Sequence, residues 1–290
     1  MDEGMKSLSK LFAAAVVLLA TCISQAKTDR GVSLVQVAAD DSHAVLQIEY
    51  WGPEMRNRPG DFNVDGTGFL VGRDGYFITA AHVMERYKPS SGQLSTAIHT
   101  RDGNGSGIWF DVIETDSAHD LALCKLKVFN PSKVPLGGSS RPAASYMPIT
   151  SLTISAEGAK PGELIAMIGY PLGSFVSPII QMGNIAATDA MLDAVPNFPA
   201  GRHDLLVVSV AGNHGDSGCP IISLETGEVL GMIIQYVPAP LLSVTDGAGR
   251  KDVAQQSGLM VAVPAKWILE MLNRHGVANA PIRPKEHLFM

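Results

Sequence analysis

The chain has 290 residues, 46% of them hydrophobic, so it is long enough to bury a substantial core as one large unit or two small domains. Its formal net charge of −6, with no block or stripe of basic residues, argues against a nucleic-acid partner. The 29 glycines and 18 prolines are scattered between short apolar runs, which is typical of many short strands joined by turns.

The first 26 residues are predicted to be a cleaved export signal. Lys6 and Lys10 precede an apolar stretch at residues 11–20. Ser24 and Ala26 then supply small residues at the −3 and −1 positions of a cleavage site. The apolar stretch is about half as long as the roughly 20 residues needed to span a bilayer. We therefore expect an exported protein, periplasmic or secreted, with no stable membrane anchor.

The few cysteines bear on two alternatives. Residues 19–22, Leu-Ala-Thr-Cys, resemble a lipoprotein cleavage motif, but threonine fits its third position poorly. Loss of Cys22 with the signal leaves Cys124 and Cys219, which either form one disulfide or remain two small buried thiols. Their spacing fits no metal site, and neither a metal nor another cofactor is expected.

After a polar lead segment at residues 27–42, short apolar runs alternate with turn signals. A stretch rich in proline, glycine and serine at residues 130–146 reads as a linker between two series of runs. We expect an all-β fold, with a first β-barrel over residues 43–140 and a second over residues 141–275. The runs are 45–51, 66–72, 76–79, 108–113 and 121–128, then 164–169, 179–187, 205–210, 220–223, 229–236 and 259–263.

The only helical pattern lies at the end of the second unit, before a tail at residues 276–290. Pro264 stands at an early helical position, where proline is tolerated. The apolar residues that follow at three- and four-residue spacing are Trp267, Ile268, Met271 and Leu272. This spacing predicts a C-terminal helix with one buried face.

Three segments supply the residue types that nucleophilic acyl transfer needs. They are Phe-Ile-Thr-Ala-Ala-His-Val at 77–83, Ala-His-Asp-Leu-Ala-Leu at 118–123 and Asn-His-Gly-Asp-Ser-Gly-Cys-Pro at 213–220. A serine hydroxyl is a weak nucleophile unless an imidazole takes its proton, and that imidazole needs a carboxylate to fix its tautomer. The glycines around the serine allow a sharp turn that can aim N–H groups at an oxyanion.

Within these segments, His82, Asp120 and Ser217 are the candidates for base, orienting acid and nucleophile. Asp120 is preferred over Asp116 because it directly precedes an apolar strand. His119 lacks the small residues that precede His82, so it reads as a surface neighbour. His214 either shapes the loop before Ser217 or contacts substrate, and we favour the first.

The order of these motifs resembles the chymotrypsin-like serine protease clan. The matching motifs are TAAHV, DLAL and GDSG. Further patches resemble the exported bacterial proteases of the high-temperature-requirement A (HtrA) group, and together they extend over residues 66–271. These patches are GTGFLV, GYPLGSFVSPIIQMGNIAA, GEVLGM and GLMVAVP.

The resemblance implies two antiparallel six-stranded barrels, a His82–Asp120–Ser217 triad, and an oxyanion hole made by the N–H groups of Gly215 and Ser217. The chain departs from the HtrA pattern around the serine. Asp216 stands where that group usually has asparagine, and Cys219 stands where it has a second glycine. Asp216 is expected to pair with a group other than a new N-terminal amine, because no Ile-Val-Gly-Gly-like start is present. The PDZ domain typical of the group is expected to be missing.

The resemblance also implies which residues line the specificity pocket. They are Ala211, six residues before Ser217, and the run Ile234-Gln235-Tyr236. Since none of the four carries a carboxylate, cleavage is predicted after small or medium apolar residues rather than after lysine or arginine.

The predicted function is that of a serine endopeptidase acting on proteins or peptides through an acyl-enzyme. An α/β-hydrolase is disfavoured because Cys219 replaces the second glycine of Gly-x-Ser-x-Gly and the histidine comes first. A Cys219 nucleophile is disfavoured because Ser217 already occupies the glycine-flanked position. A zinc enzyme is disfavoured because no His-Glu-x-x-His motif occurs. The alternative is a catalytically silent or conformationally gated homologue that acts as a binding protein.

Overall fold

The computed structural model describes residues 31–51, 63–85, 93–98, 107–127, 134–135, 146–147, 150–173, 177–190, 204–246 and 249–281. The predicted export signal and most of the predicted linker lie outside these residues. No helix within them is long and apolar enough to cross a membrane.

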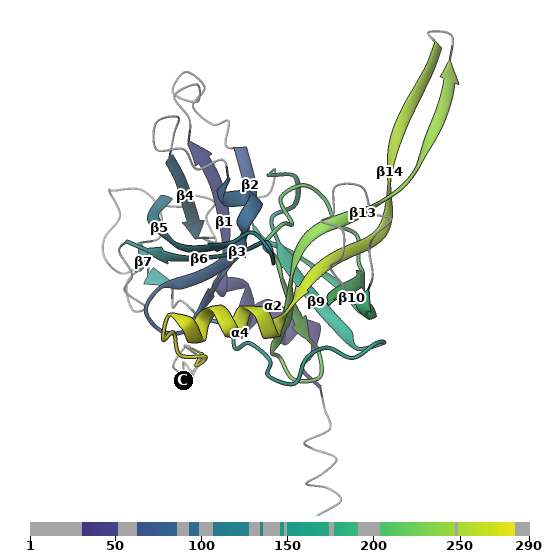
Figure 1. The fold of residues 1–290 in the computed structure, drawn as a ribbon. Coiled ribbons are helices and arrows are strands. Elements are labelled where there is room, and N and C mark those ends of the chain that lie inside the picture. The colour runs from purple at the N-terminus through teal and green to yellow at the C-terminus, as the bar shows by residue number, and fades with distance from the viewer. Residues whose placement is uncertain are drawn as a thin grey trace, which may run out of the picture.

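Two closed six-stranded barrels make up the body of the molecule (Figure 1). The first has the strand order β1-β2-β3-β6-β5-β4 and the second β10-β11-β14-β13-β12-β9. All the strand pairs are antiparallel, and the predicted fold class is confirmed. The first barrel contains β1 (Val45–Trp51), β2 (Asn63–Val71), β3 (Tyr76–Ala80), β4 (Gln93–Ile98), β5 (Gly107–Asp116) and β6 (Leu121–Leu126). The second contains β9 (Leu164–Gly169), β10 (Ile179–Ala190), β11 (Leu205–Ser209), β12 (Pro220–Ser223), β13 (Val229–Asp246) and β14 (Gly249–Pro264).

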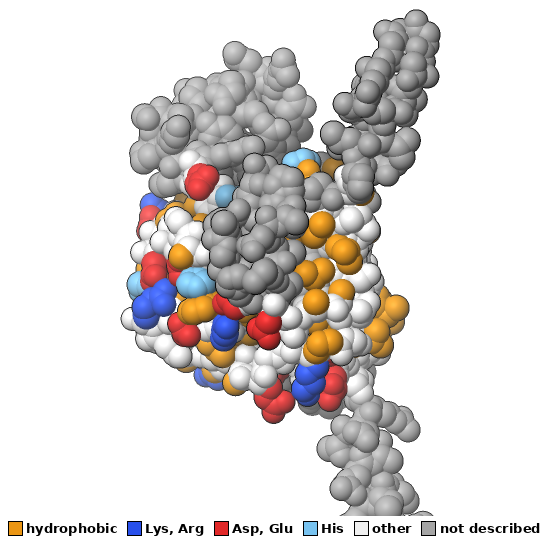
Figure 2. Space-filling view, turned by 45° about the vertical axis from the view of Figure 1, so that its right-hand side comes forward, with side chains coloured by type: hydrophobic (Ala, Val, Ile, Leu, Met, Phe, Trp, Pro, Cys, Tyr) orange, Lys and Arg blue, Asp and Glu red, His pale blue; other side chains and the backbone are white. Residues whose placement is uncertain are grey.

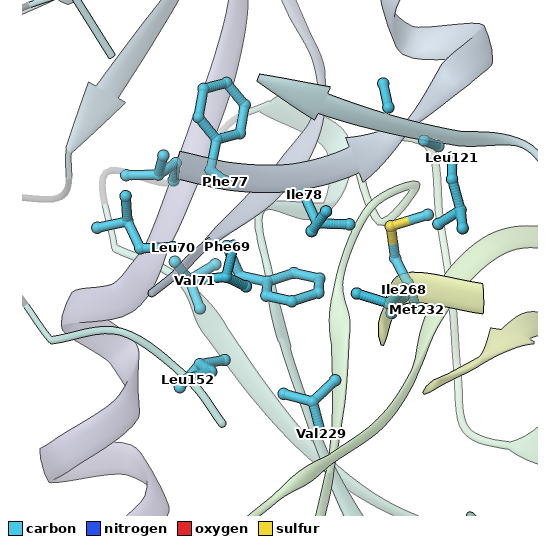
Figure 3. Close-up of a cluster of buried hydrophobic side chains, with 14 of the residues drawn as sticks. Phe69, Leu70, Val71, Phe77, Ile78, Leu121, Leu152, Val229, Met232 and Ile268 are labelled. Atoms are coloured by element: carbon cyan, nitrogen blue, oxygen red, sulfur yellow. The ribbon is translucent and has the colours of Figure 1, made fainter. Parts of the chain in front are cut away.

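The C-terminal helix α4 (Ala265–Arg274) forms where the apolar spacing predicted it. Its buried residues are Ala265, Ile268, Met271 and Leu272. The helix joins the two units, because Ile268 belongs to one buried cluster with Ile78 of β3 and Met232 of β13 (Figure 3). Burial of a side chain of this size contributes about 1.5–3 kcal/mol, so the cluster holds the helix against both barrels.

Several elements were not apparent in the sequence. The lead segment contains helix α2 (Leu34–Asp41), which begins at the N-cap Ser33 and buries only Val37, too little for an apolar stripe to be visible. Strand β4 was also missed. Within the linker, β7 (Val134–Pro135) pairs with β8 (Tyr146–Met147). The remaining short elements are the 3-10 helices Ser42–Ala44 and Pro171–Gly173, and the single-turn helix α3 (Ala81–Met84).

Strands β13 and β14 are longer than predicted and extend out of the second barrel as a two-stranded arm (Figure 1). Pairing with β12 ends at Met232 and pairing with β11 ends at Leu259, whereas β13 and β14 stay paired up to Asp246 and Gly249. The predicted run ended at residue 236. Pro238 and Pro240 follow in β13, and a strand accommodates proline only where it has a free edge.

Acidic and basic side chains are interspersed over the lower part of the face in Figure 2, and hydrophobic side chains gather toward its right-hand side. Leu164 of β9 and Met182 of β10 are among the large apolar residues that remain exposed, at 55% and 60%.

Candidate active site

The first barrel brings His82 and Asp120 together at the ends of two neighbouring strands. His82 lies in α3, directly after β3, and Asp120 ends the turn before β6. Ala80 pairs with Leu121 across the two strands, so the residues that follow and precede them meet. His82 Nδ1 lies 2.7 Å from Asp120 Oδ2, and the His82 main-chain N–H donates to Asp120 Oδ1 at 2.9 Å. Both carboxylate oxygens therefore hold the histidine, one through its ring and one through its backbone.

The other acid and histidine of this region form a separate pair. His119 Nδ1 lies 2.8 Å from Asp116 Oδ2, and Asp116 Oδ1 accepts the main-chain N–H groups of Ala118 and His119. Asp116 is therefore engaged within its own turn and does not contact His82. Asp120 itself has a φ of 55°, in the left-handed region that aspartate adopts more readily than most residues.

The second barrel supplies Ser217 on the loop before β12. Its hydroxyl donates to the main-chain carbonyl of Ile234 at 3.5 Å and makes no hydrogen bond to His82. The serine nevertheless lies beside α3. A Cβ on Gly66 would crowd both Val83, the neighbour of His82, and the carbonyl oxygen of Ser217. The structure therefore places Ser217 and His82 at the same junction between the barrels.

Glycine is required on both sides of Ser217 for lack of space. Gly218 has a φ of +92°, and a Cβ there would overlap the carbonyl oxygen of Thr67. Gly215 has a φ of +96°, and a Cβ there would overlap the carbonyl oxygen of Tyr170. The loop is thus packed backbone to backbone, which explains the Gly-Asp-Ser-Gly pattern in steric terms.

Thr67 of β2 joins this loop to the first barrel, a role that the sequence analysis missed. Its N–H donates to Ser217 O at 2.8 Å, and its hydroxyl donates to Gly215 O at 2.8 Å. The same hydroxyl accepts the N–H of Tyr170 at 3.1 Å, and the Thr67 carbonyl accepts the Thr79 hydroxyl at 2.7 Å. The available signal was a threonine between two glycines, Gly66 and Gly68, directly before the apolar run at residues 69–71.

The N–H groups of the loop divide into two sets. Those of Asp216 and Gly218 donate to the carbonyls of Asn213 and Ile233. Those of Gly215 and Ser217 donate to no residue among those the structure describes. A pair of N–H groups free to bind an oxyanion is what an acyl-transfer site requires.

Asp216 is fully buried behind Ser217. Its Oδ2 accepts the Asn213 N–H at 2.8 Å, and its Oδ1 lies 3.6 Å from the Cys219 thiol. Burial raises the pKa of Asp216 to about 6, against the opposing effect of these two hydrogen bonds.

Cys124 and Cys219 are free, buried thiols, so the disulfide alternative is wrong for this structure. Burial and the nearby Asp216 raise the pKa of the Cys219 thiol, which further disfavours it as a nucleophile. Cys219 also fills the space in which a side chain on Gly169 would lie.

The four residues predicted to line the pocket differ in exposure. Ala211 is exposed, Gln235 and Tyr236 are half-buried, and Ile234 is buried with its carbonyl toward Ser217. The ring of His214 meets that of Tyr236 edge to face at 6.2 Å. Among the described residues, no three His, Cys, Asp or Glu side chains gather closely enough to hold a metal ion.

Comparison with known proteins bears on this geometry. Residues 66–232, more than half of the chain, match the sequence model of the trypsin-like peptidase domain. The chain belongs to this family. The match begins at Gly66 and includes the segments that carry His82, Asp120 and Ser217.

Curated relatives agree with this assignment. A probable periplasmic serine endoprotease, DegP-like, from Chlamydia pneumoniae is 28% identical over 62% of this chain and 30% of its own length. The putative serine protease HhoB of Synechocystis is 28% identical over 63% of this chain and 37% of its own. The serine endoprotease DegS of Haemophilus influenzae is 25% identical over 73% of this chain and 51% of its own. The chain thus spans about a third of the length of the first two.

Proposed function

We propose that the chain is a serine endopeptidase in which Ser217 is the nucleophile, His82 the general base and Asp120 the group that orients the imidazole. The observation that carries the proposal is the two-point attachment of His82 to Asp120 at the barrel junction where Ser217 lies. Membership of the trypsin-like peptidase family supports it, as do the names of the relatives, which describe serine endoproteases.

The proposed reaction follows from the hydrogen bonds that the His82 ring already makes. Because Nδ1 of His82 faces Asp120, Nε2 is the nitrogen left to take the Ser217 proton. Oγ then bonds to the peptide carbonyl carbon, and the N–H groups of Gly215 and Ser217 stabilise the oxyanion. The C–N bond breaks, the amine leaves with the proton from His82, and an acyl-enzyme remains. Water attacks this ester with His82 again as base, which releases the acid and restores Ser217.

The contact of the Ser217 hydroxyl with Ile234 means that the serine side chain must rotate toward His82 when substrate binds. Hydrogen bonds between a catalytic nucleophile and its base are often long in free enzymes and shorten in the substrate complex. The same contact is the one observation that favours a gated homologue, in which the rotation awaits a partner. We favour the enzyme because all three side-chain types are present and two of them are already paired.

Cleavage is proposed to occur after small or medium apolar residues. Ala211 and the run 234–236 offer no counter-charge, and an unpaired lysine or arginine would lose its hydration in an apolar pocket. A peptide library digested by the protein and sequenced by mass spectrometry tests this. Cuts after Val, Ala, Leu or Met are expected. A dominant cut after lysine or arginine would overturn the assignment of the pocket.

We also propose that the protein is exported, with cleavage before Lys27. The names of several relatives describe them as periplasmic. N-terminal sequencing of protein recovered from an exporting host should find Lys27 first. A lipidated Cys22 would contradict the proposal.

The activity itself is tested with casein as substrate. The wild type should degrade casein, and Ser217→Ala should lose cleavage with an unchanged melting temperature, because it removes one hydroxyl from a half-buried site. His82→Ala should lose as much, since the two residues act as a unit. Equal cleavage by Ser217→Ala and wild type would sink the proposal.

A further inference from the structure

We propose that His119 and Trp267 are positioning residues, which tie the C-terminal helix and the second barrel to the turn that carries Asp120. The inference rests on the proposed function, because it concerns how the His82–Asp120 pair is held. It deepens that proposal by assigning a role to a stacked pair of rings outside the triad.

The turn at residues 117–120 has contacts on two sides. On one side, Asp120 holds His82 through both carboxylate oxygens, and the Ala81 N–H donates to the Asp120 carbonyl at 3.0 Å. On the other side, the ring of His119 stacks on the indole of Trp267, with ring centroids 3.7 Å apart and planes inclined by 28°. Of these two neighbouring residues, Asp120 thus contacts His82 of the candidate site and His119 contacts the C-terminal helix.

The indole is itself fixed by the second barrel. Trp267 Nε1 donates to Asp204 Oδ2, and Asp204 directly precedes β11. Lys266 contacts the same carboxylate at 3.3 Å from the exposed side of the helix. A continuous set of contacts therefore runs from Asp204 through Trp267 and His119 to the turn.

The His119 ring is also held from within its turn. Its Nδ1 lies 2.8 Å from Asp116, whose other oxygen accepts two N–H groups of the turn. The ring cannot leave the indole without disturbing the turn. Because Asp120 adopts a left-handed φ of 55°, it relies on its surroundings to stay in this conformation. The stack of His119 on Trp267 supports the turn that carries Asp120. Such support matters because a shift of about 1 Å in a catalytic group costs up to roughly 100-fold in rate.

Two ring-preserving substitutions separate position from mere stability. His119→Phe and Trp267→Phe each keep an aromatic ring in the stack, whereas His119→Ala and Trp267→Ala remove it. We expect the alanine variants to lose about tenfold or more in kcat with KM changed less than twofold. The phenylalanine variants keep the stack but lose the hydrogen bond to Asp116 or Asp204, so their kcat should lie between those of the alanine variants and the wild type. Glu270→Ala is the matched control, since Glu270 lies on the same helix with an exposed side chain, and it should keep the wild-type kcat.

A second readout does not require turnover. The proton on His82 Nδ1 gives a downfield NMR signal while it is hydrogen-bonded to Asp120, and His82→Ala identifies that signal by its loss. The signal should persist in wild type and in His119→Phe, and weaken or vanish in His119→Ala. If His119→Ala keeps the signal and kcat stays within twofold of wild type, the positioning role is wrong. A third outcome is that the wild type shows the signal and His119→Ala loses it, but the wild type cleaves nothing. In that case the proposed function fails and the positioning role stands.

Discussion

The two halves of the candidate site are held in different ways. On the first barrel, His82 and Asp120 meet through side-chain hydrogen bonds near the surface, with side chains 42% and 22% exposed. On the second, the Ser217 loop is held by backbone packing, with Gly215 and Gly218 pressed against carbonyl oxygens and Asp216 fully buried. The first half can lose one contact and keep its fold, whereas the second has no space in which to relax. Substitutions at Gly215 and Gly218 should therefore act on stability and activity together.

The largest effect is expected from Gly218→Ala, which tests the steric half of this contrast. The methyl group would overlap Thr67 O in a left-handed backbone, so we expect a loss of at least about 3 kcal/mol of unfolding free energy and no measurable cleavage. Gly158→Ala is the control, because Gly158 has a similar φ of +79° with open space around it, and it should cost about 1 kcal/mol. Urea unfolding of both variants measures the difference, and equal losses would refute the packing argument.

A smaller effect is expected from Thr67→Val, which tests the link between the two halves. Valine keeps the shape of threonine but leaves the buried Gly215 carbonyl and Tyr170 N–H without their partner, at a cost of about 1–3 kcal/mol. Because the N–H of Gly215 is part of the proposed oxyanion site, kcat should fall about tenfold while KM changes little. Thr67→Ser keeps the hydroxyl and should retain most of the activity. If the valine and serine variants behave alike in kcat, the hydroxyl does not position the loop.

The third prediction concerns the pH dependence that the buried half creates. The pKa of Asp216 is about 6 in the folded protein and about 3.9 in an unfolded chain, so the folded state binds the proton more tightly. Asp216 therefore lowers stability as pH rises from about 4 to 6, by about 3 kcal/mol in all. Glu114 acts in the opposite direction, because its hydrogen bond from Arg274 lowers its pKa. Asp216→Asn removes only the first effect.

Unfolding free energies at pH 4.5 and pH 7 measure this difference. The unfolding free energy of Asp216→Asn minus that of the wild type should be more positive at pH 7 than at pH 4.5. An identical pH slope in the two proteins would show that Asp216 does not titrate as a buried acid.

The sequence predicted what depends on local pattern. The strand-like runs predicted the two barrels and the apolar spacing at residues 267–272 predicted α4, because each element reports its own buried face. The pairing of His82 with Asp120 was predicted from motifs that carry the necessary residue types, and the distances agree with that pairing.

What the sequence did not predict depends on contacts between distant segments. Thr67 lies 148 residues from Gly215, and no local pattern reveals that its hydroxyl reaches that loop. The stack of His119 on Trp267 likewise joins a turn of the first barrel to the last helix. The arm was missed for a different reason, since Pro238 and Pro240 indicate a strand end unless the edge is known to be free.

The central claim is that Ser217 is a nucleophile activated by His82, and covalent labelling tests it most directly. The protein is treated with a fluorophosphonate, digested, and the modified peptide located by mass spectrometry. We expect one adduct on Ser217, none in Ser217→Ala, and strongly slowed labelling in His82→Ala. No adduct on folded wild-type protein, or an adduct formed at the same rate in His82→Ala, would contradict the account.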